Sequence, residues 1–173
     1  MTRIILLRAV NVGGAKLPMA ELRALMTDLG ATNITTYIQS GNAICTPPGD
    51  PDAFDRALEK AIETRFGYFR ESISRGPEEL SEALKAHPFE EVDPRYSYVT
   101  FFSKPPTEAA VVKARTYETG DDQWDVIGRD MHIRYAHGAG RPDMNTASIM
   151  RALKEPGTAR NLNTVRKLIE LAG

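Results

Sequence analysis

Three short segments gather polar residues, in each case amides together with glycines, cations or both, in patterns that could hold an anion. The first, LLRAVNVGGAK, carries Arg8, Asn11, Gly13, Gly14 and Lys16 at the end of an apolar run. Glycines let successive backbone N–H groups point toward one place, and a helix start behind them adds partial positive charge. The segment is neither a P-loop nor a dinucleotide-binding glycine motif. It therefore indicates an anion-binding loop, with a plain tight turn as the structural alternative.

The second segment, YIQSGN, groups hydrogen-bonding side chains at the tip of an expected hairpin. These side chains belong to Gln39, Ser40 and Asn42. Asn and Gly are ordinary hairpin residues, so a turn without a ligand is again the alternative. The segment gains interest because the glycine loop could lie at the same end of the sheet.

The third segment, TARNLNTVRKL, lies near the end of the chain. Asn161, Asn163 and Thr164 each suit the N-cap of a helix, and Arg160 stands beside them. One cap is enough for a helix, so the surplus of polar donors next to cations suits recognition of phosphate or carboxylate. A well-capped helix is the structural alternative.

Composition describes a globular chain with a sizeable core. The 173 residues are 42% hydrophobic and 26% charged, with a net charge of -1. That balance argues against a general DNA-coating protein, although both ends of the chain are basic and the middle is acidic. No apolar run approaches the length of a membrane span, and no signal-peptide layout begins the chain. A single cysteine, Cys45, fits a reducing compartment, so we expect a cytoplasmic protein.

No catalytic or metal-binding pattern accompanies the three segments. His87, His132 and His137 lack metal-ligand spacing, and His132 and His137 are predicted to be surface side chains. No histidine or carboxylate falls within the three segments, so they offer no evident general base. We therefore predict no metal and no cofactor, and the sequence leaves the oligomeric state open.

The first half of the chain has the element order strand, helix, strand, strand, helix, strand. Hydrophobic periodicity and turn residues predict these elements at residues 3–10, 18–29, 33–39, 43–46, 50–66 and 68–74. This is the βαββαβ order of a ferredoxin-like unit. A helix at 77–86 follows, and the irregular stretch HPFEEVDPR marks the best domain boundary in the chain.

The second half repeats the order without a sixth strand. Strands are predicted at 96–103, 123–128 and 131–136, and helices at 107–116, 143–154 and 162–172. We therefore expect an α+β protein of two ferredoxin-like subdomains, the second with an extra C-terminal helix. The expected domains are residues 1–88 and 95–173.

LLRAVNVGG, YIQSGN and TARNLNTVRKL, in this order, resemble the bacterial family called domain of unknown function 1697, over about residues 1–172. The resemblance implies two ferredoxin-like α+β subdomains and no assigned activity. It carries over these motif residues: Arg8, Asn11, Gly13, Gly14, Gln39, Ser40, Gly41, Asn42, Arg160, Asn161, Asn163 and Thr164. The chain departs from the family in having Ala9 in place of a glycine, Leu162 in place of an aromatic residue, and GRPD in place of a Ser-Lys pair.

Three polar segments from distant parts of one chain are explained most simply by one shared polar pocket. A helical crossover favours parallel neighbours for the strands at 3–10 and 33–39, which would bring Asn11 near Gln39. Arg160 and Asn161 would approach from the second subdomain. The leading hypothesis is a protein that binds a phosphate-bearing ligand, either a nucleotide or a short nucleic acid. The alternatives are a metal-independent enzyme acting on such a ligand and a protein-interaction module.

Overall fold

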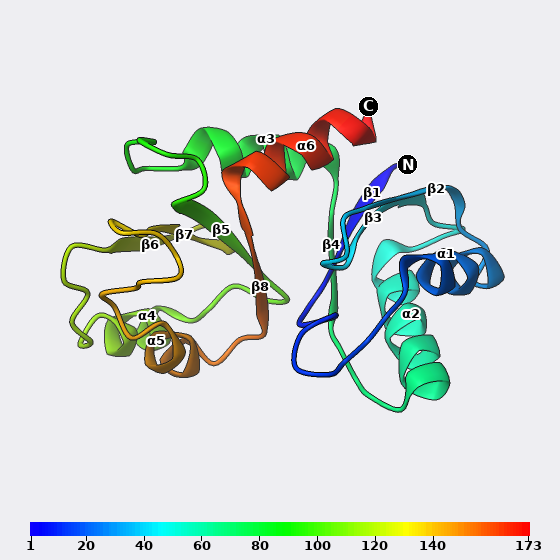
Figure 1. Cartoon of the computed structure of the whole chain (residues 1–173), viewed down its shortest axis with the longest axis horizontal. Helices are drawn as coiled ribbons and strands as arrows, with labels where there is room; N and C mark the ends of the chain where they lie inside the picture. The colour runs from blue at the N-terminus through cyan, green and yellow to red at the C-terminus, as the bar shows by residue number, and fades with distance from the viewer. The chain divides into compact units, whose positions relative to one another are not determined.

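A computed structural model describes residues 1–173, which divide into two compact units. The first unit comprises residues 1–81 with 167–173, and the second comprises residues 82–166. Each unit is built on its own four-stranded sheet, and all the paired strands are antiparallel (Figure 1). The order βαββαβ occurs twice and is followed by a last helix, which confirms the α+β fold with two ferredoxin-like subdomains.

The first sheet has the strand order β2-β3-β1-β4. Its unit contains β1 (Arg3–Leu7), α1 (Met19–Asp28), β2 (Thr32–Tyr37), β3 (Asn42–Thr46), α2 (Pro51–Phe66), β4 (Ser72–Arg75) and the start of α3 (Pro77–Ala86). The apolar β1 is an inner strand and is almost wholly buried, whereas the threonine-rich β2 is an exposed edge strand. The most hydrophobic sequence thus forms an inner strand, and the more polar sequence forms an edge strand.

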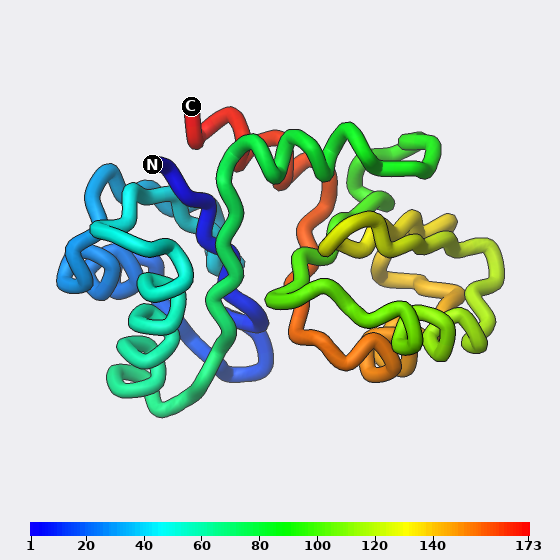
Figure 2. The backbone as a smooth tube through the Cα atoms, turned by 180° about the vertical axis from the view of Figure 1, so that it is seen from behind, coloured from blue at the N-terminus to red at the C-terminus, as the bar shows by residue number.

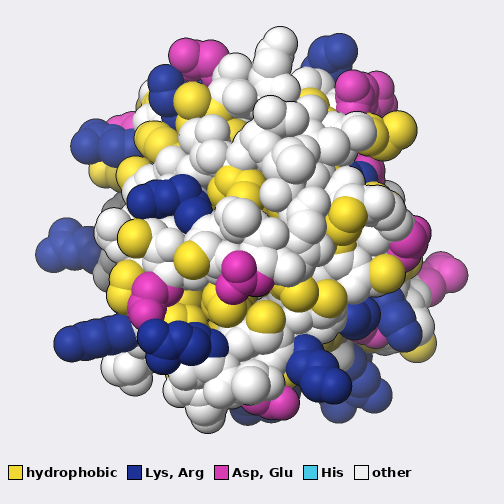
Figure 3. Space-filling model, turned by 90° about the vertical axis from the view of Figure 1, so that its right-hand side faces the viewer, with side chains coloured by type: hydrophobic (Ala, Val, Ile, Leu, Met, Phe, Trp, Pro, Cys, Tyr) yellow, Lys and Arg dark blue, Asp and Glu magenta, His cyan; other side chains and the backbone are white.

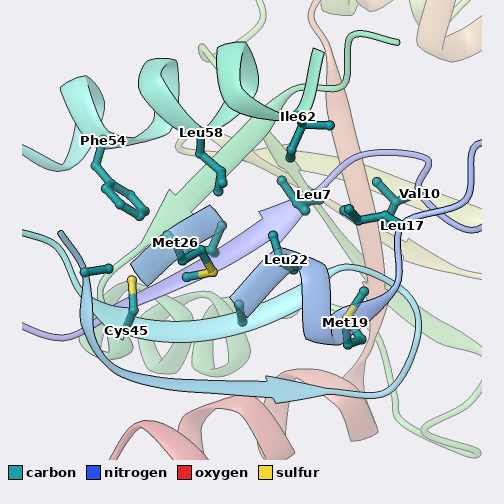
Figure 4. Close-up of a cluster of buried hydrophobic side chains, with 13 residues drawn as sticks. Leu7, Val10, Leu17, Met19, Leu22, Met26, Cys45, Phe54, Leu58 and Ile62 are labelled. Atoms are coloured by element: carbon teal, nitrogen blue, oxygen red, sulfur yellow. The ribbon is translucent and has the colours of Figure 1, made fainter. Parts of the chain in front are cut away.

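Helices α1 and α2 cover one face of this sheet, as the blue and cyan parts of the trace show (Figure 2). Leu22 and Met26 of α1 and Leu58 and Ile62 of α2 pack on Leu7 in one apolar cluster (Figure 4). A spacing of four residues places the two members of each pair on one helix face. This core includes Leu7, the last residue of β1, directly before the segment that leads to α1.

Helix α2 begins and ends where its sequence predicts. The Asp50 carboxylate accepts the Ala53 N–H at 2.9 Å, Pro51 occupies the first turn, and Gly67 ends the helix with φ of 79°. A second prediction is corrected: β1 and β2 are not neighbours, because both pair with β3, which lies between them. Since both are antiparallel to β3, they still run parallel to each other and end at the same edge of the sheet.

The second sheet has the strand order β6-β7-β5-β8. Its elements are β5 (Ser97–Phe102), α4 (Glu108–Ala114), β6 (Gln123–Ile127), β7 (Asp130–Arg134), α5 (Thr146–Leu153), β8 (Gly157–Asn161) and α6 (Leu162–Ala172), the last of which continues beyond the unit. Phe102, Met131 and Ile133 of the sheet pack with Ile149 and Leu153 of α5. None of the helices is long and apolar enough to cross a membrane.

Strand β8 was not predicted, and its composition explains why. It pairs with β5, placing Gly157 opposite Phe102. A Cβ on Gly157 would lie 2.8 Å from Thr100 Cγ2, so this register depends on glycine. The inward positions of β8 are Thr158 and Arg160, so the strand lacks the alternating hydrophobic residues by which a half-buried strand is recognised.

Candidate functional site

The glycine loop between β1 and α1 is a compact, self-bonded turn. Asn11 N–H donates to the Ala15 carbonyl at 2.7 Å, and Lys16 N–H donates to the Gly14 carbonyl at 3.0 Å. Gly13 and Gly14 both have positive φ, at 57° and 87°. The amides of Val12, Gly13 and Gly14 take no part in these internal bonds, and all three residues are exposed. Three consecutive exposed residues of the loop therefore have no backbone N–H donating within it, and binding of an anion there stays a prediction.

Asn11 has a structural role that sequence alone did not identify. Its Nδ2 donates to the Leu17 carbonyl at 3.0 Å and to the Gln39 carbonyl, and its Oδ1 accepts the Leu17 N–H at 2.8 Å. These bonds employ both ends of the amide. Asn11 thus joins the exit of the glycine loop to the Gln39 turn, and the predicted proximity of Asn11 and Gln39 is confirmed.

The turn at Gln39–Asn42 is fixed by close packing on β1. Asn42 is fully buried and donates to the Tyr37 carbonyl at 3.3 Å and to Ser40 Oγ at 3.0 Å. Gly41 has φ of 81°, and a Cβ there would lie 2.5 Å from Val10 Cγ2. Asn42 therefore shapes the turn, whereas the side chain of Gln39 lies on the exposed side.

A hollow of about 410 Å³ lies where this turn meets the start of α1. Its lining residues are Pro18, Met19, Ala20, Arg23, Thr36, Ile38 and Gln39. Pro18 occupies the N-cap position, and no side chain caps the first turn of α1. The uncapped N–H groups carry the positive end of the helix dipole. Arg23 adds a full charge at this rim and donates to Thr36 Oγ1 at 2.6 Å.

Further cations flank the glycine loop. Arg8 pairs with Glu71 at 3.3 Å, and Arg70 Nε donates to the Ala9 carbonyl at 3.1 Å. The Tyr68 hydroxyl donates to the Lys16 carbonyl at 2.8 Å, so the segment before β4 lies along the loop. Sequence reasoning found Arg8 and Lys16 but missed Arg23 and Arg70. Arg23 is an exposed residue of α1, and an arginine at such a position has no distinguishing sequence pattern.

The candidate residues of the third polar segment, residues 160–164, lie in the second unit and are described there by themselves. Arg160 is 8% exposed, and its guanidinium donates to Thr158 Oγ1 and to the Ala159 carbonyl. Burial lowers the pKa of Arg160 to about 10. Asn161 Oδ1 accepts the Thr164 N–H at 2.9 Å and so caps α6, while Asn163 is exposed. Participation of these four residues in ligand binding stays a prediction.

The histidines behave differently from one another. His137 is exposed as predicted, but the surface placement of His132 was wrong, because this residue is 1% exposed. Its Nδ1 lies 3.0 Å from His87 Nδ1. Burial, together with the neighbouring His87, lowers the pKa of His132 to about 4. The face of β7 that bears His132 is covered by the segment around His87, which the strand pattern could not show.

The fold and these loops define a class: an α+β protein of two ferredoxin-like units with a glycine loop and a polar hollow in the first unit. Residues 1–132 match the family described as "Protein of unknown function (DUF1697)", and the chain belongs to this family. The matched stretch contains the first two polar segments and ends before the third. No functionally curated protein matches the chain.

The fold also occurs in a solved structure, that of the conserved bacterial protein SP0830 from Streptococcus pneumoniae. The two chains are 22% identical, with a TM-score of 0.78. The similarity covers 99% of this chain and 98% of that chain. At this identity, the likeness shows a shared fold over the full length of both proteins.

Proposed function

We propose that this protein binds a phosphate-bearing ligand, a nucleotide or a short nucleic acid, at the hollow beside the glycine loop. One observation carries the proposal. Through Asn11, the exit of the glycine loop, the uncapped start of α1 and the Gln39 turn meet at one place, which borders a hollow of about 410 Å³. An uncapped helix start and a nearby arginine both favour an anion.

The ligand's phosphate would sit against the first turn of α1. Arg23 would supply charge, Gln39 would supply a neutral amide, and the amides of residues 12–14 would hold a second phosphate or a sugar hydroxyl. An arginine–phosphate contact is charge-assisted and has defined geometry, so it should carry much of the affinity. We also propose that the protein is cytoplasmic. The single cysteine, Cys45, is a free and buried thiol, as suits a reducing compartment.

Titration calorimetry with inorganic phosphate, AMP, ATP and a short single-stranded oligonucleotide tests this proposal. We expect Arg23→Ala to weaken binding about 10-fold, which corresponds to about 1.4 kcal/mol. Arg151→Ala, at an exposed position of α5, is the matched control and should bind normally. Arg160→Ala is a poor test, because removing a buried guanidinium lowers stability whatever its role. Equal affinity in both variants, or no binding of any probe, would refute the proposal.

A second candidate function, protein interaction, is favoured by an apolar groove between α1 and α2. The groove has a volume of about 680 Å³ and is lined by Leu25, Leu29, Ala57, Lys60, Ala61, Thr64 and Arg65. Figure 3 looks onto the side where α1 and α2 lie and shows apolar side chains with Lys and Arg around them. If this groove binds a protein, Ala61→Glu should abolish cross-linking of this chain to that protein, whereas Arg23→Ala should leave the cross-linking unchanged.

A further inference from the structure

Three metal-binding side chains converge in the loops around the β6–β7 hairpin, within the second unit. Asp121 precedes β6, His137 follows β7, and Asp143 precedes α5. One ligand atom from each lies within 4.8 Å of the other two. His137 Nε2 is 3.5 Å from Asp143 Oδ2 and 3.8 Å from Asp121 Oδ2. Asp121 and His137 are 16 positions apart in the sequence, and His137 and Asp143 are 6 positions apart, so the three residues do not form a local sequence motif.

A buried carboxylate fixes the backbone that carries these side chains. Asp122 is 3% exposed and accepts the N–H groups of Ala136, Asp143 and Met144 at 2.8, 2.7 and 3.1 Å. Each of the three loops therefore has a residue bonded to Asp122 or contains Asp122 itself. The ligand side chains project from a backbone that is already arranged, which lowers the entropy lost when a metal binds.

Close approach of Asp121 to Asp143 also depends on glycine. Gly120 has φ of 58°, and a Cβ there would lie 2.7 Å from Asp143 Cβ. The Asp121 N–H donates to Asp143 Oδ2 at 3.1 Å. The chain thus brings two carboxylates together beside an imidazole, an arrangement in which like charges repel unless a cation or a proton lies between them.

We propose that Asp121, His137 and Asp143 bind a divalent transition-metal ion, with Zn²⁺ preferred and water completing the coordination. One imidazole nitrogen and two carboxylate oxygens form a zinc donor set, with metal–ligand distances of about 2.0–2.2 Å. Those distances require donor atoms roughly 3.4 Å apart in tetrahedral geometry, so the exposed side chains need only small rotations. Mg²⁺ and Ca²⁺ prefer all-oxygen sites and should bind more weakly.

The test uses the full chain after treatment with a chelator. Calorimetry with Zn²⁺ should show one equivalent bound, and Co²⁺ should give a visible absorption band. His137→Ala and Asp143→Asn should each weaken Zn²⁺ binding by at least about 10-fold. Both positions are exposed, and circular dichroism of each variant checks that it folds. Saturating Zn²⁺ should also raise the melting temperature of the wild type but not that of His137→Ala.

Two control variants separate this site from the other candidate ligands. His132→Gln removes a member of the buried histidine pair, and Asp28→Asn removes an exposed carboxylate at the end of α1. Both should bind Zn²⁺ as the wild type does. Absence of stoichiometric binding, unchanged binding by His137→Ala and Asp143→Asn, or equal affinity for Zn²⁺ and Mg²⁺ would each overturn the proposal.

Discussion

Acid should destabilise this protein through the His87–His132 pair. The two Nδ1 atoms are 3.0 Å apart, a distance at which one neutral imidazole can donate a hydrogen bond to the other. Burial lowers the pKa of His132 from 6.5 to about 4, and burial also lowers the pKa of His87. Between pH 6.5 and about pH 4, His132 binds a proton in the unfolded chain but not in the folded chain. The contribution of neutral His132 to the free energy of unfolding is therefore fully present above about pH 6.5 and is lost as the pH falls toward 4.

The expected loss follows from these pKa values. For His132 alone, the free energy of unfolding should be about 2 kcal/mol smaller at pH 5 than at pH 8, and about 3 kcal/mol smaller near pH 3. His87 acts in the same direction. Carboxyl groups also titrate in this range: burial raises the pKa of Asp55 and Glu59, and a bond from Arg166 lowers the pKa of Glu91. The measurement must therefore be a difference between variants.

Urea unfolding at pH 5 and pH 8 supplies that difference. In His132→Gln, an amide replaces the imidazole and can still hydrogen-bond to His87, so the loss at pH 5 should shrink by about 2 kcal/mol. His137→Gln, which removes an exposed histidine outside the pair, should not reduce the loss. If the wild type and both variants lose the same stability on acidification, the buried pair does not set the acid response and the reasoning is wrong.

Three further predictions concern the loops, each measured by urea unfolding at neutral pH. Ala9 has φ of 53°, so Ala9→Gly should stabilise by up to about 1 kcal/mol, and a loss of stability would contradict that conformation. Gly41→Ala should cost at least about 2 kcal/mol, because its Cβ would lie 2.5 Å from Val10 Cγ2; a neutral change would mean that the turn can move away. Asp122→Ala should cost about 3 kcal/mol, because three backbone N–H groups lose their acceptor, and a cost below about 1 kcal/mol would show that water replaces it.

Much of the fold follows from local sequence signals. Asp50, Pro51 and Gly67 mark both ends of α2 because capping depends only on neighbouring residues. Strand β8 could not be found in this way, since its inward residues include Arg160 and its register depends on the contact of Gly157 with Thr100. Both features depend on tertiary packing, because Gly157 and Thr100 are far apart in the sequence and local sequence patterns do not include both residues.

The candidate site was also predictable only in part. The prediction that Asn11 lies near Gln39 came from the direction of the two strands and is correct, whereas a ligand-binding role for Asn11 stays a prediction. The structure adds that its amide bonds to Leu17 and Gln39 and holds the loop in place. Arg23 lines the hollow from α1 and was missed, because an exposed arginine on a helix has no distinguishing pattern. The sequence shows which polar side chains could bind a ligand. The structure is needed to show which of them already bond to other groups of the protein.

The central claim is most directly tested by NMR titration of the ¹⁵N-labelled full chain with AMP. Binding at the proposed place should shift the backbone amides of Gly13, Gly14 and Ala20 and the side-chain amide of Gln39, with saturation at a common affinity. In Arg23→Ala the same signals should move only at about 10-fold higher AMP concentration. If the amides of residues 12–14 and Ala20 stay in place while signals elsewhere shift, or if nothing shifts, the phosphate site is not where this account puts it.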